Sequence, residues 1–157
     1  MKVIKCFPII VLVVLAACSA MKTPETPLTV THVTSLNAAV DAFASETTLV
    51  IHDQKSWEDL WSKMIARVSP APPVPAVDFT KNVLLVAASG TQVTGGYSMV
   101  ITDATESSGS ITVNVTASTP GSSCVVSQGL SSPVDLATIP LRDGMVSFNI
   151  TRKTQSC

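Results

Sequence analysis

Side chains suited to catalysis are sparse in this 157-residue sequence, and their spacing indicates little chemistry. Its two histidines are His32 and His52, and neither lies near a cysteine or carboxylate at metal-ligand spacing. His52 and Asp53 could form half of a hydrolytic triad, but such neighbours beside a loop are usually a solvated pair. There is no G-x-S-x-G elbow, and the S-x-x-K match, Ser19 to Lys22, lies in a segment without a rigid scaffold. We therefore expect no enzymatic activity, no metal site and no cofactor.

The first 17 residues have the layout of a secretory signal peptide. Met1 to Lys5 carries two positive charges, and Cys6 to Ala17 is an apolar run interrupted only by Pro8. As a helix this run spans about 18 Å, against roughly 30 Å of bilayer hydrocarbon, so a permanent transmembrane segment is the poorer interpretation. The sequence therefore predicts export.

The residues Leu15-Ala16-Ala17-Cys18 resemble the lipobox of bacterial lipoprotein precursors. This resemblance implies a covalent diacylglycerol on the Cys18 sulfur, cleavage after Ala17 and acylation of the new amine. Two or three acyl chains anchor a protein stably where one does not. The alternative is an ordinary signal peptide with an incidental cysteine. We expect lipid anchoring in the bacterial cell envelope and, because Ser19 rather than Asp follows the cysteine, in an outer membrane, facing the periplasm or the cell surface.

Cleavage after residue 17 leaves one domain and a tether rather than two domains. We expect the tether at 18–27, which is polar and holds two prolines, and the domain at 28–157. Loss of Lys2 and Lys5 leaves eight basic residues against 11 acidic ones, a net charge of −3. Nucleic acid and anionic lipid are poor partners for a domain without a basic cluster.

Cysteine usage follows from the same cleavage. Cys6 is discarded and Cys18 is lipidated, which leaves Cys124 and Cys157. Two thiols in an exported protein can pair, and a loop of this length would add about 3 to 4 kcal/mol of stability in the loop-entropy model. Two unpaired cysteines are the alternative.

Hydrophobic spacing predicts one helix at residues 56–67. Ser56 is a good N-cap, with Glu58 and Asp59 favourable at the positive helix end. One apolar stripe follows at helical spacing, and we expect both of its tryptophans to pack against a sheet: Trp57, Leu60, Trp61, Met64 and Ile65. Ser69-Pro70 should end this helix and open a polyproline-like crossover. A second, short helical face is expected at Leu36, Ala39, Val40 and Phe43.

Most other periodic segments alternate with period two, which is typical of strands. The expected strands are Leu28–Thr34, Thr47–His52, Asn82–Ser89, Tyr97–Asp103, Ser110–Ala117, Ser123–Gln128, Val134–Ile139 and Met145–Thr151. Asp143-Gly144 predicts a hairpin for the last pair. The fold class is therefore mainly β, a small β-sandwich or two-layer antiparallel sheet with one amphipathic helix packed on it.

One loop stands out, Gly90-Thr91-Gln92-Val93-Thr94-Gly95-Gly96-Tyr97. Gly95 and Gly96 permit positive φ, so the chain can turn tightly while exposing backbone groups beside the Tyr97 ring. The alternative is a plain hairpin whose tyrosine packs on the end of the sandwich. Loops on rigid sheets, however, also supply binding surfaces.

Residues 48–141 resemble the C-terminal domain family of PrcB, the protease-complex subunit. The most specific motifs are V-D-F at Val77 to Phe79 and G-T-x-x-T-G-G-Y-S at Gly90 to Ser98; the remaining matches are Ile51, Trp57, Leu60-Trp61, Pro75-Ala76, Val83 to Val86, Pro120-Gly121, Gln128 and Ile139-Pro140. The resemblance implies a small, often lipid-anchored domain that stabilises or assembles a cell-surface protease. It marks Thr94, Gly95, Gly96 and Tyr97 as signature residues.

Three hypotheses follow. The first is a non-enzymatic lipoprotein that binds an envelope protein, for example a protease, through the loop carrying Gly90, Thr91, Thr94, Gly95, Gly96 and Tyr97. The second is a protease inhibitor that uses the same loop as a wedge, as chagasin-type inhibitors do. The third, an envelope hydrolase, is disfavoured because no nucleophile and base pair stands out.

Overall fold

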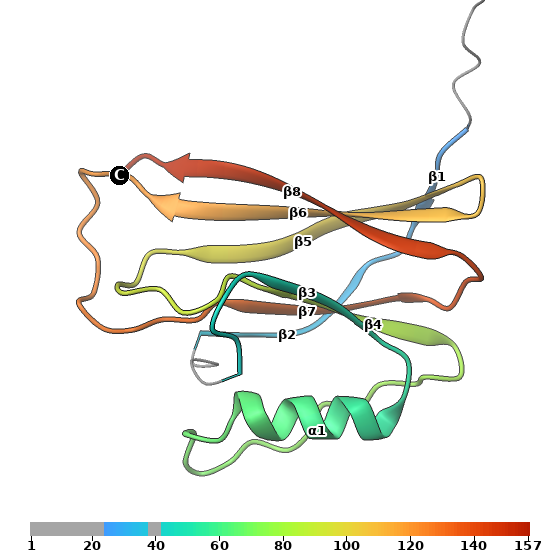
Figure 1. Cartoon of the computed structure of the whole chain (residues 1–157), viewed down its shortest axis with the longest axis horizontal. Coiled ribbons are helices and arrows are strands. Elements are labelled where there is room, and N and C mark those ends of the chain that lie inside the picture. Colours follow the sequence, from blue (N-terminus) through green and yellow to red (C-terminus); the bar gives the residue numbers. More distant parts are fainter. Residues whose placement is uncertain (1–23, 38–41) are drawn as a thin grey trace, which may run out of the picture.

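The described part of the chain, residues 24–37 and 42–157 of a computed structural model, forms two sheets and one helix (Figure 1). The elements are β1 (Thr26–Leu28), β2 (Thr31–Leu36), β3 (Thr47–Ile51), α1 (Gln54–Met64), β4 (Asn82–Ala88), β5 (Ser98–Ser107), β6 (Ser110–Pro120), β7 (Val134–Pro140) and β8 (Met145–Gln155). Cys18, the signal peptide, and Ala39 and Val40 of the expected second helix lie outside the described residues.

The two sheets pack face to face as a β-sandwich, and α1 covers the outer face of one of them (Figure 1). Their strand orders are β1-β5-β6-β8 and β2-β7-β4-β3. All neighbours are antiparallel except β6 and β8, which run parallel over their full length. The expected mainly β sandwich with one packed helix is confirmed.

Strand β4 is buried on both faces, which explains its unbroken apolar sequence. Val83, Leu85 and Ala87 pack between the two sheets. The alternate residues, Leu84, Val86 and Ala88, pack against the helix side. One sheet therefore forms the middle layer of three.

Helix α1 begins two residues earlier than expected, because Asp53 rather than Ser56 is its N-cap. The Asp53 carboxylate accepts the Ser56 backbone N–H at 2.8 Å and the Ser56 hydroxyl at 2.7 Å. These two bonds lower the pKa of Asp53. The helix ends at Met64, three residues before the expected end.

Both tryptophans of α1 face the core as expected. Trp57 is fully buried and Trp61 nearly so. Each indole N–H donates to a carbonyl of the proline-rich crossover, Trp57 to Pro75 at 2.9 Å and Trp61 to Pro72 at 3.3 Å. The crossover therefore satisfies the polar atoms of the rings that the helix buries.

Four predictions about the elements and their connections are wrong. The expected strand Leu28–Thr34 is divided between β1 and β2, which belong to different sheets. Residues 123–128 form no strand. Asp143-Gly144 does not close a hairpin, because β7 and β8 belong to different sheets and β8 pairs with β6 instead. Thr26 and Pro27, expected in the tether, already pair with β5 as part of β1. Alternation favours a strand, but it does not guarantee one, as residues 123–128 show, and it does not say with which strand it will pair.

We predict that Trp57→Ala lowers the free energy of unfolding by about 3 to 5 kcal/mol, because it leaves a cavity and an unpaired Pro75 carbonyl. Urea denaturation followed by circular dichroism measures this. Val125→Ala is the control, since Val125 is fully exposed, and it should leave the midpoint unchanged. A Trp57→Ala midpoint equal to that of the control would contradict this packing.

Candidate functional site

The loop Gly90 to Tyr97 crosses between the two sheets. It leaves β4 of the middle sheet and enters β5 of the outer sheet, so it spans one end of the sandwich (Figure 1). The plain hairpin considered from the sequence is therefore wrong, because a hairpin would join neighbouring strands of one sheet.

A second segment, residues 121–131, lies against this loop and is hydrogen-bonded to it. Gln92 and Ser131 exchange two backbone bonds, of 2.7 and 3.0 Å. The Gly95 N–H donates to the Ser127 carbonyl at 2.9 Å, and the Ser131 hydroxyl donates to the Thr94 carbonyl at 2.6 Å. Thr91 reaches the other way and donates its hydroxyl to the Phe43 carbonyl. The loop is thus fixed from both sides.

Two glycines of the loop are required by backbone conformation. Gly90 has φ +74°, and a Cβ there would lie 2.6 Å from the Ser45 carbonyl carbon. Gly96 has φ +87°, and its Cβ would meet Val126 at 2.8 Å. Positive φ was expected at Gly95 as well, but only Gly90, Gly96 and Gly109 adopt it among the described glycines. Gly95 is buried under residue 127. These glycines therefore shape the loop.

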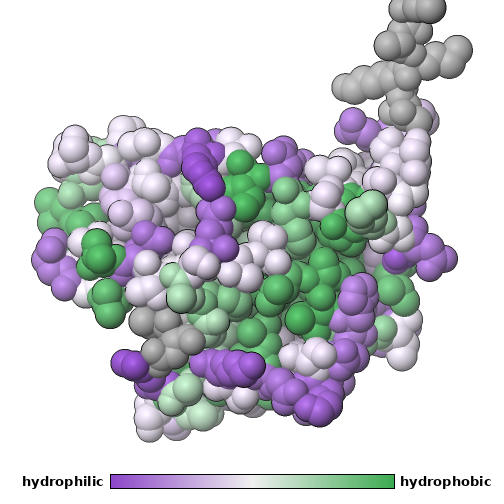
Figure 2. Space-filling model, in the orientation of Figure 1, coloured by the Kyte–Doolittle hydropathy of each residue, from purple (hydrophilic) through white to green (hydrophobic). Residues whose placement is uncertain are grey.

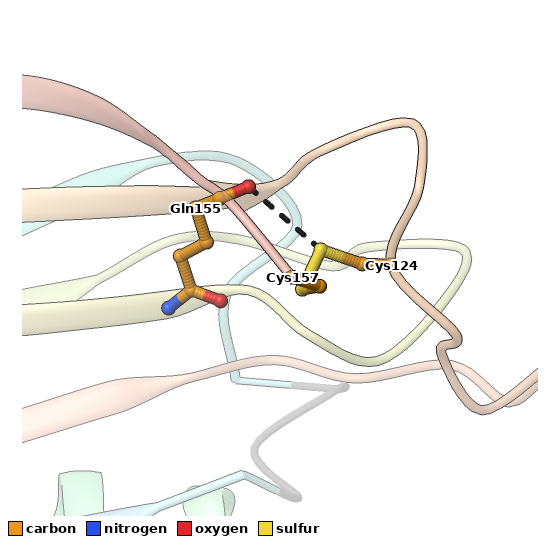
Figure 3. Close-up of a disulfide and its surroundings, with 3 residues drawn as sticks. All are labelled: Cys124, Gln155 and Cys157. Carbon is orange, nitrogen blue, oxygen red and sulfur yellow. Dashed lines mark hydrogen bonds between the residues drawn. A yellow bond between two sulfur atoms is a disulfide. The ribbon is translucent and has the colours of Figure 1, made fainter.

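A disulfide joins segment 121–131 to Cys157, two residues beyond the end of β8, as Figure 3 shows. Cys124 and Cys157 lie 33 residues apart with their Cα atoms at 5.1 Å. Beside it the Gly121 N–H donates to the Gln155 carbonyl at 3.0 Å. The pairing expected from the cysteine count is present in the structure.

Three apolar side chains on the two joined segments point into solvent, and we call them the apolar tip: Val93, Val125 and Leu130. Their exposed fractions are 75%, 102% and 63%. Figure 2 shows separate hydrophobic residues at this end of the molecule, among more hydrophilic ones. Exposed apolar clusters on a rigid frame are typical of protein-binding surfaces. Tyr97, by contrast, is half-buried and lines a small hollow beside Glu46 and Arg152.

The structure also brings together two residues that the sequence reasoning did not connect, His32 of β2 and Asp135 of β7. His32 Nδ1 lies 3.2 Å from Asp135 Oδ1. The other carboxylate oxygen accepts the Ile101 N–H at 2.8 Å, which links the two sheets. The available signal was an aspartate inside the apolar run 134–139, since a charge in a buried strand needs partners.

The remaining candidate residues do not gather into a reactive centre. His52 is exposed, and its neighbour Asp53 is occupied as the helix cap. Within residues 24–37 and 42–157, no group of three or more metal-ligating side chains comes together. None of the helices in this part of the chain is both long and apolar enough to cross a bilayer.

The fold and its loop end define a small β-sandwich domain that presents a disulfide-tied apolar surface. Residues 83–140, from β4 to β7, match the family model described as PrcB C-terminal. The match includes the loop and segment 121–131. No curated protein and no solved structure matches the chain significantly.

We predict that replacing Cys157 by Ser lowers the free energy of unfolding by about 3 to 4 kcal/mol, because the unfolded chain regains the entropy of the closed loop. Hydrogen exchange should show that amides of residues 121–131 lose protection while β4 keeps its own. Ser156→Ala serves as the control at the neighbouring, exposed position. Equal stability of both variants would contradict a structural role for the bond.

Proposed function

We propose that this protein is a lipid-anchored, non-enzymatic subunit of a protease complex in the bacterial outer membrane, and that it binds its partner through the apolar tip. The observation that carries the proposal is the match of residues 83–140 to the PrcB C-terminal family. The loop Gly90 to Tyr97 lies inside that match, and this loop carries Val93, one of the three side chains of the apolar tip.

The arrangement of the two ends supports this role. The chain enters β1 at one end of the sandwich, whereas the loop Gly90 to Tyr97 and segment 121–131 lie at the other (Figure 1). A lipid on Cys18 would be joined to β1 by a few tether residues, which reach roughly 25 Å when extended. An anchor at one end leaves the apolar tip directed away from the membrane, toward a neighbouring protein.

The rigidity of the tip favours binding over a wedge-like inhibitor. An inhibitory wedge needs a loop that projects, but Gly95 is buried and its N–H is bonded to Ser127. An apolar surface that is already ordered before binding loses little conformational entropy when a partner covers it. In typical protein interfaces, a small number of anchor residues accounts for most of the affinity.

We predict that Val93→Asp combined with Val125→Asp reduces recovery of cross-linked partner proteins from native membranes about tenfold, because two charges would have to be desolvated in the interface. Quantitative mass spectrometry measures the recovery. The matched control is Met145→Asp, an apolar residue of 76% exposure at the start of β8, at the opposite end of the sandwich.

Exposed positions are chosen rather than a loop glycine such as Gly96, because a Cβ at Gly96 would strain the loop itself. Partner recovery that is equal for the double variant and for Met145→Asp would remove the apolar tip from this role.

We predict that Cys18→Ser moves the protein from the membrane fraction to the soluble fraction, because the acyl chains supply the membrane affinity. Fractionation of the producing cells, with intact mass of the mature chain, measures both location and lipid. Cys6→Ser is the control, since that residue would leave with the signal peptide. Retention of Cys18→Ser in the membrane fraction, or a wild-type mass that shows no lipid on Cys18, would refute the proposed anchor.

A further inference from the structure

Strand β8 is the outermost strand of its sheet and leaves that side of the sandwich open. Its 11 residues pair with β6 on one side, and among the described strands β8 has no neighbour on the other. The Gln155 carbonyl accepts the N–H of Gly121, which follows β6, so odd-numbered residues of β8 direct their backbone groups toward β6. By alternation, the N–H and C=O groups of Phe148, Ile150 and Arg152 point out of the sheet. A long edge of this kind pairs readily with another strand.

The sequence of β6 is repeated in β8. Residues 111–116 of β6 read Ile-Thr-Val-Asn-Val-Thr, and residues 146–151 of β8 read Val-Ser-Phe-Asn-Ile-Thr. The parallel register places each residue of one motif beside its equivalent in the other, so that Asn114 lies beside Asn149. Strand β6 therefore shows which kind of sequence fits beside β8. It has apolar residues toward the core, and hydroxyl residues around a central asparagine on the other face.

A ladder of side-chain hydrogen bonds across this face gives the open edge a defined acceptor. Asn114 donates a side-chain N–H to Asp103 Oδ1 at 2.6 Å, and Asn149 donates one to Asn114 Oδ1 at 2.9 Å. An ionised carboxylate can only accept, so Asp103 fixes the direction in which both amides donate. The Asn149 Oδ1 atom consequently lies on the side of its amide away from β6, and it has no hydrogen-bond partner among the described residues. A strand that covers β8 completes the ladder when it places a donor opposite Asn149.

A second copy of the chain fits this edge less well than a separate strand does. In each folded copy β6 occupies one side of β8, so two copies can join their free edges, with their apolar faces on the same side, only in an antiparallel arrangement. That arrangement directs the two β1 ends, from which the tethers lead to Cys18, to opposite ends of the joined sheet (Figure 1). One membrane could not then hold both copies with their apolar tips directed away from it. A separate strand has no such restriction and can run parallel, as β6 does.

We propose that the free edge of β8 binds an extended segment of the partner protein, which runs parallel to β8 and carries an asparagine opposite Asn149. This asparagine donates a side-chain N–H to Asn149 Oδ1, so the ladder gains one more member. Its backbone pairs with the outward groups of Phe148 and Ile150. The inference rests on the proposed function in that it takes the partner to be a protein beside the same membrane. It adds the sequence pattern of the segment, which is apolar, Ser or Thr, apolar, Asn, apolar, Thr.

The test uses a fluorescent synthetic peptide with the sequence of residues 110–119, Ser-Ile-Thr-Val-Asn-Val-Thr-Ala-Ser-Thr, titrated with the full mature chain in detergent. We expect saturable binding in fluorescence anisotropy. Replacing the asparagine of the peptide by aspartate, which has the same shape but no side-chain N–H, should weaken binding about tenfold, because two acceptors would then face each other. In the protein, Asn149→Ala should weaken binding by a similar factor. The matched control, Asn37→Ala, changes an exposed asparagine far from β8 in the sequence and should bind as wild type does.

Two further measurements locate the peptide. Hydrogen exchange should slow at the outward amides of Phe148 and Ile150. A photo-crosslinker at the N-terminus of the peptide should label the chain near Met145 rather than near Gln155, because the added strand runs parallel to β8. Labelling near Gln155, equal binding of the asparagine and aspartate peptides, or no binding at all overturns the proposal, as does a β8 edge closed by a second copy of the chain in solution.

The membrane cross-linking experiment with the apolar-tip variants is independent of this test, because the peptide titration needs neither the partner nor the membrane. Partner recovery without peptide binding would refute the edge site alone. Peptide binding without a recovered partner would refute the proposed function alone.

Discussion

Burial of the middle sheet on both faces is the constraint on which the rest of the structure depends. Strand β4 contributes side chains alternately to the layer between the sheets and to the layer under α1. A sheet in this position needs a cover on each side, because neither face tolerates water. The outer sheet supplies one cover and the tryptophan stripe of α1 supplies the other. The edges and ends of the sandwich remain as the surfaces left for interaction.

Local signals in the sequence predicted the elements well, and long-range pairing poorly. The stripe from Trp57 to Met64 predicted a helix and its buried face, because period and amphipathicity are properties of adjacent turns. The helix start was misplaced because Asp53 and Ser56 are both good caps, and only the tertiary path of the chain decides between them. Parallel pairing of β8 with β6 was not predictable, since short turns suggest hairpins whichever sheet the strands join.

The same division holds for the candidate site. The adjacent glycines at 95 and 96 marked this loop as a special one, but positive φ occurs at Gly96 and Gly90 and not at Gly95. Neither the covering segment 121–131 nor the contact between His32 and Asp135 could be foreseen. These contacts join residues more than 30 positions apart, and one sequence contains no measure of their proximity. The disulfide was the exception, because counting the cysteines left a single possible pair.

Parallel pairing of β6 with β8 has a consequence for the order in which the fold can form. All of β7, which belongs to the other sheet, is synthesised between the two strands. Until β8 arrives, β6 presents 11 residues of unpaired edge that alternate in and out of the core. Nascent chains at this stage are exposed to association with one another through that edge. Docking of β8 covers this edge, and β8 itself then becomes the outer edge of the sheet.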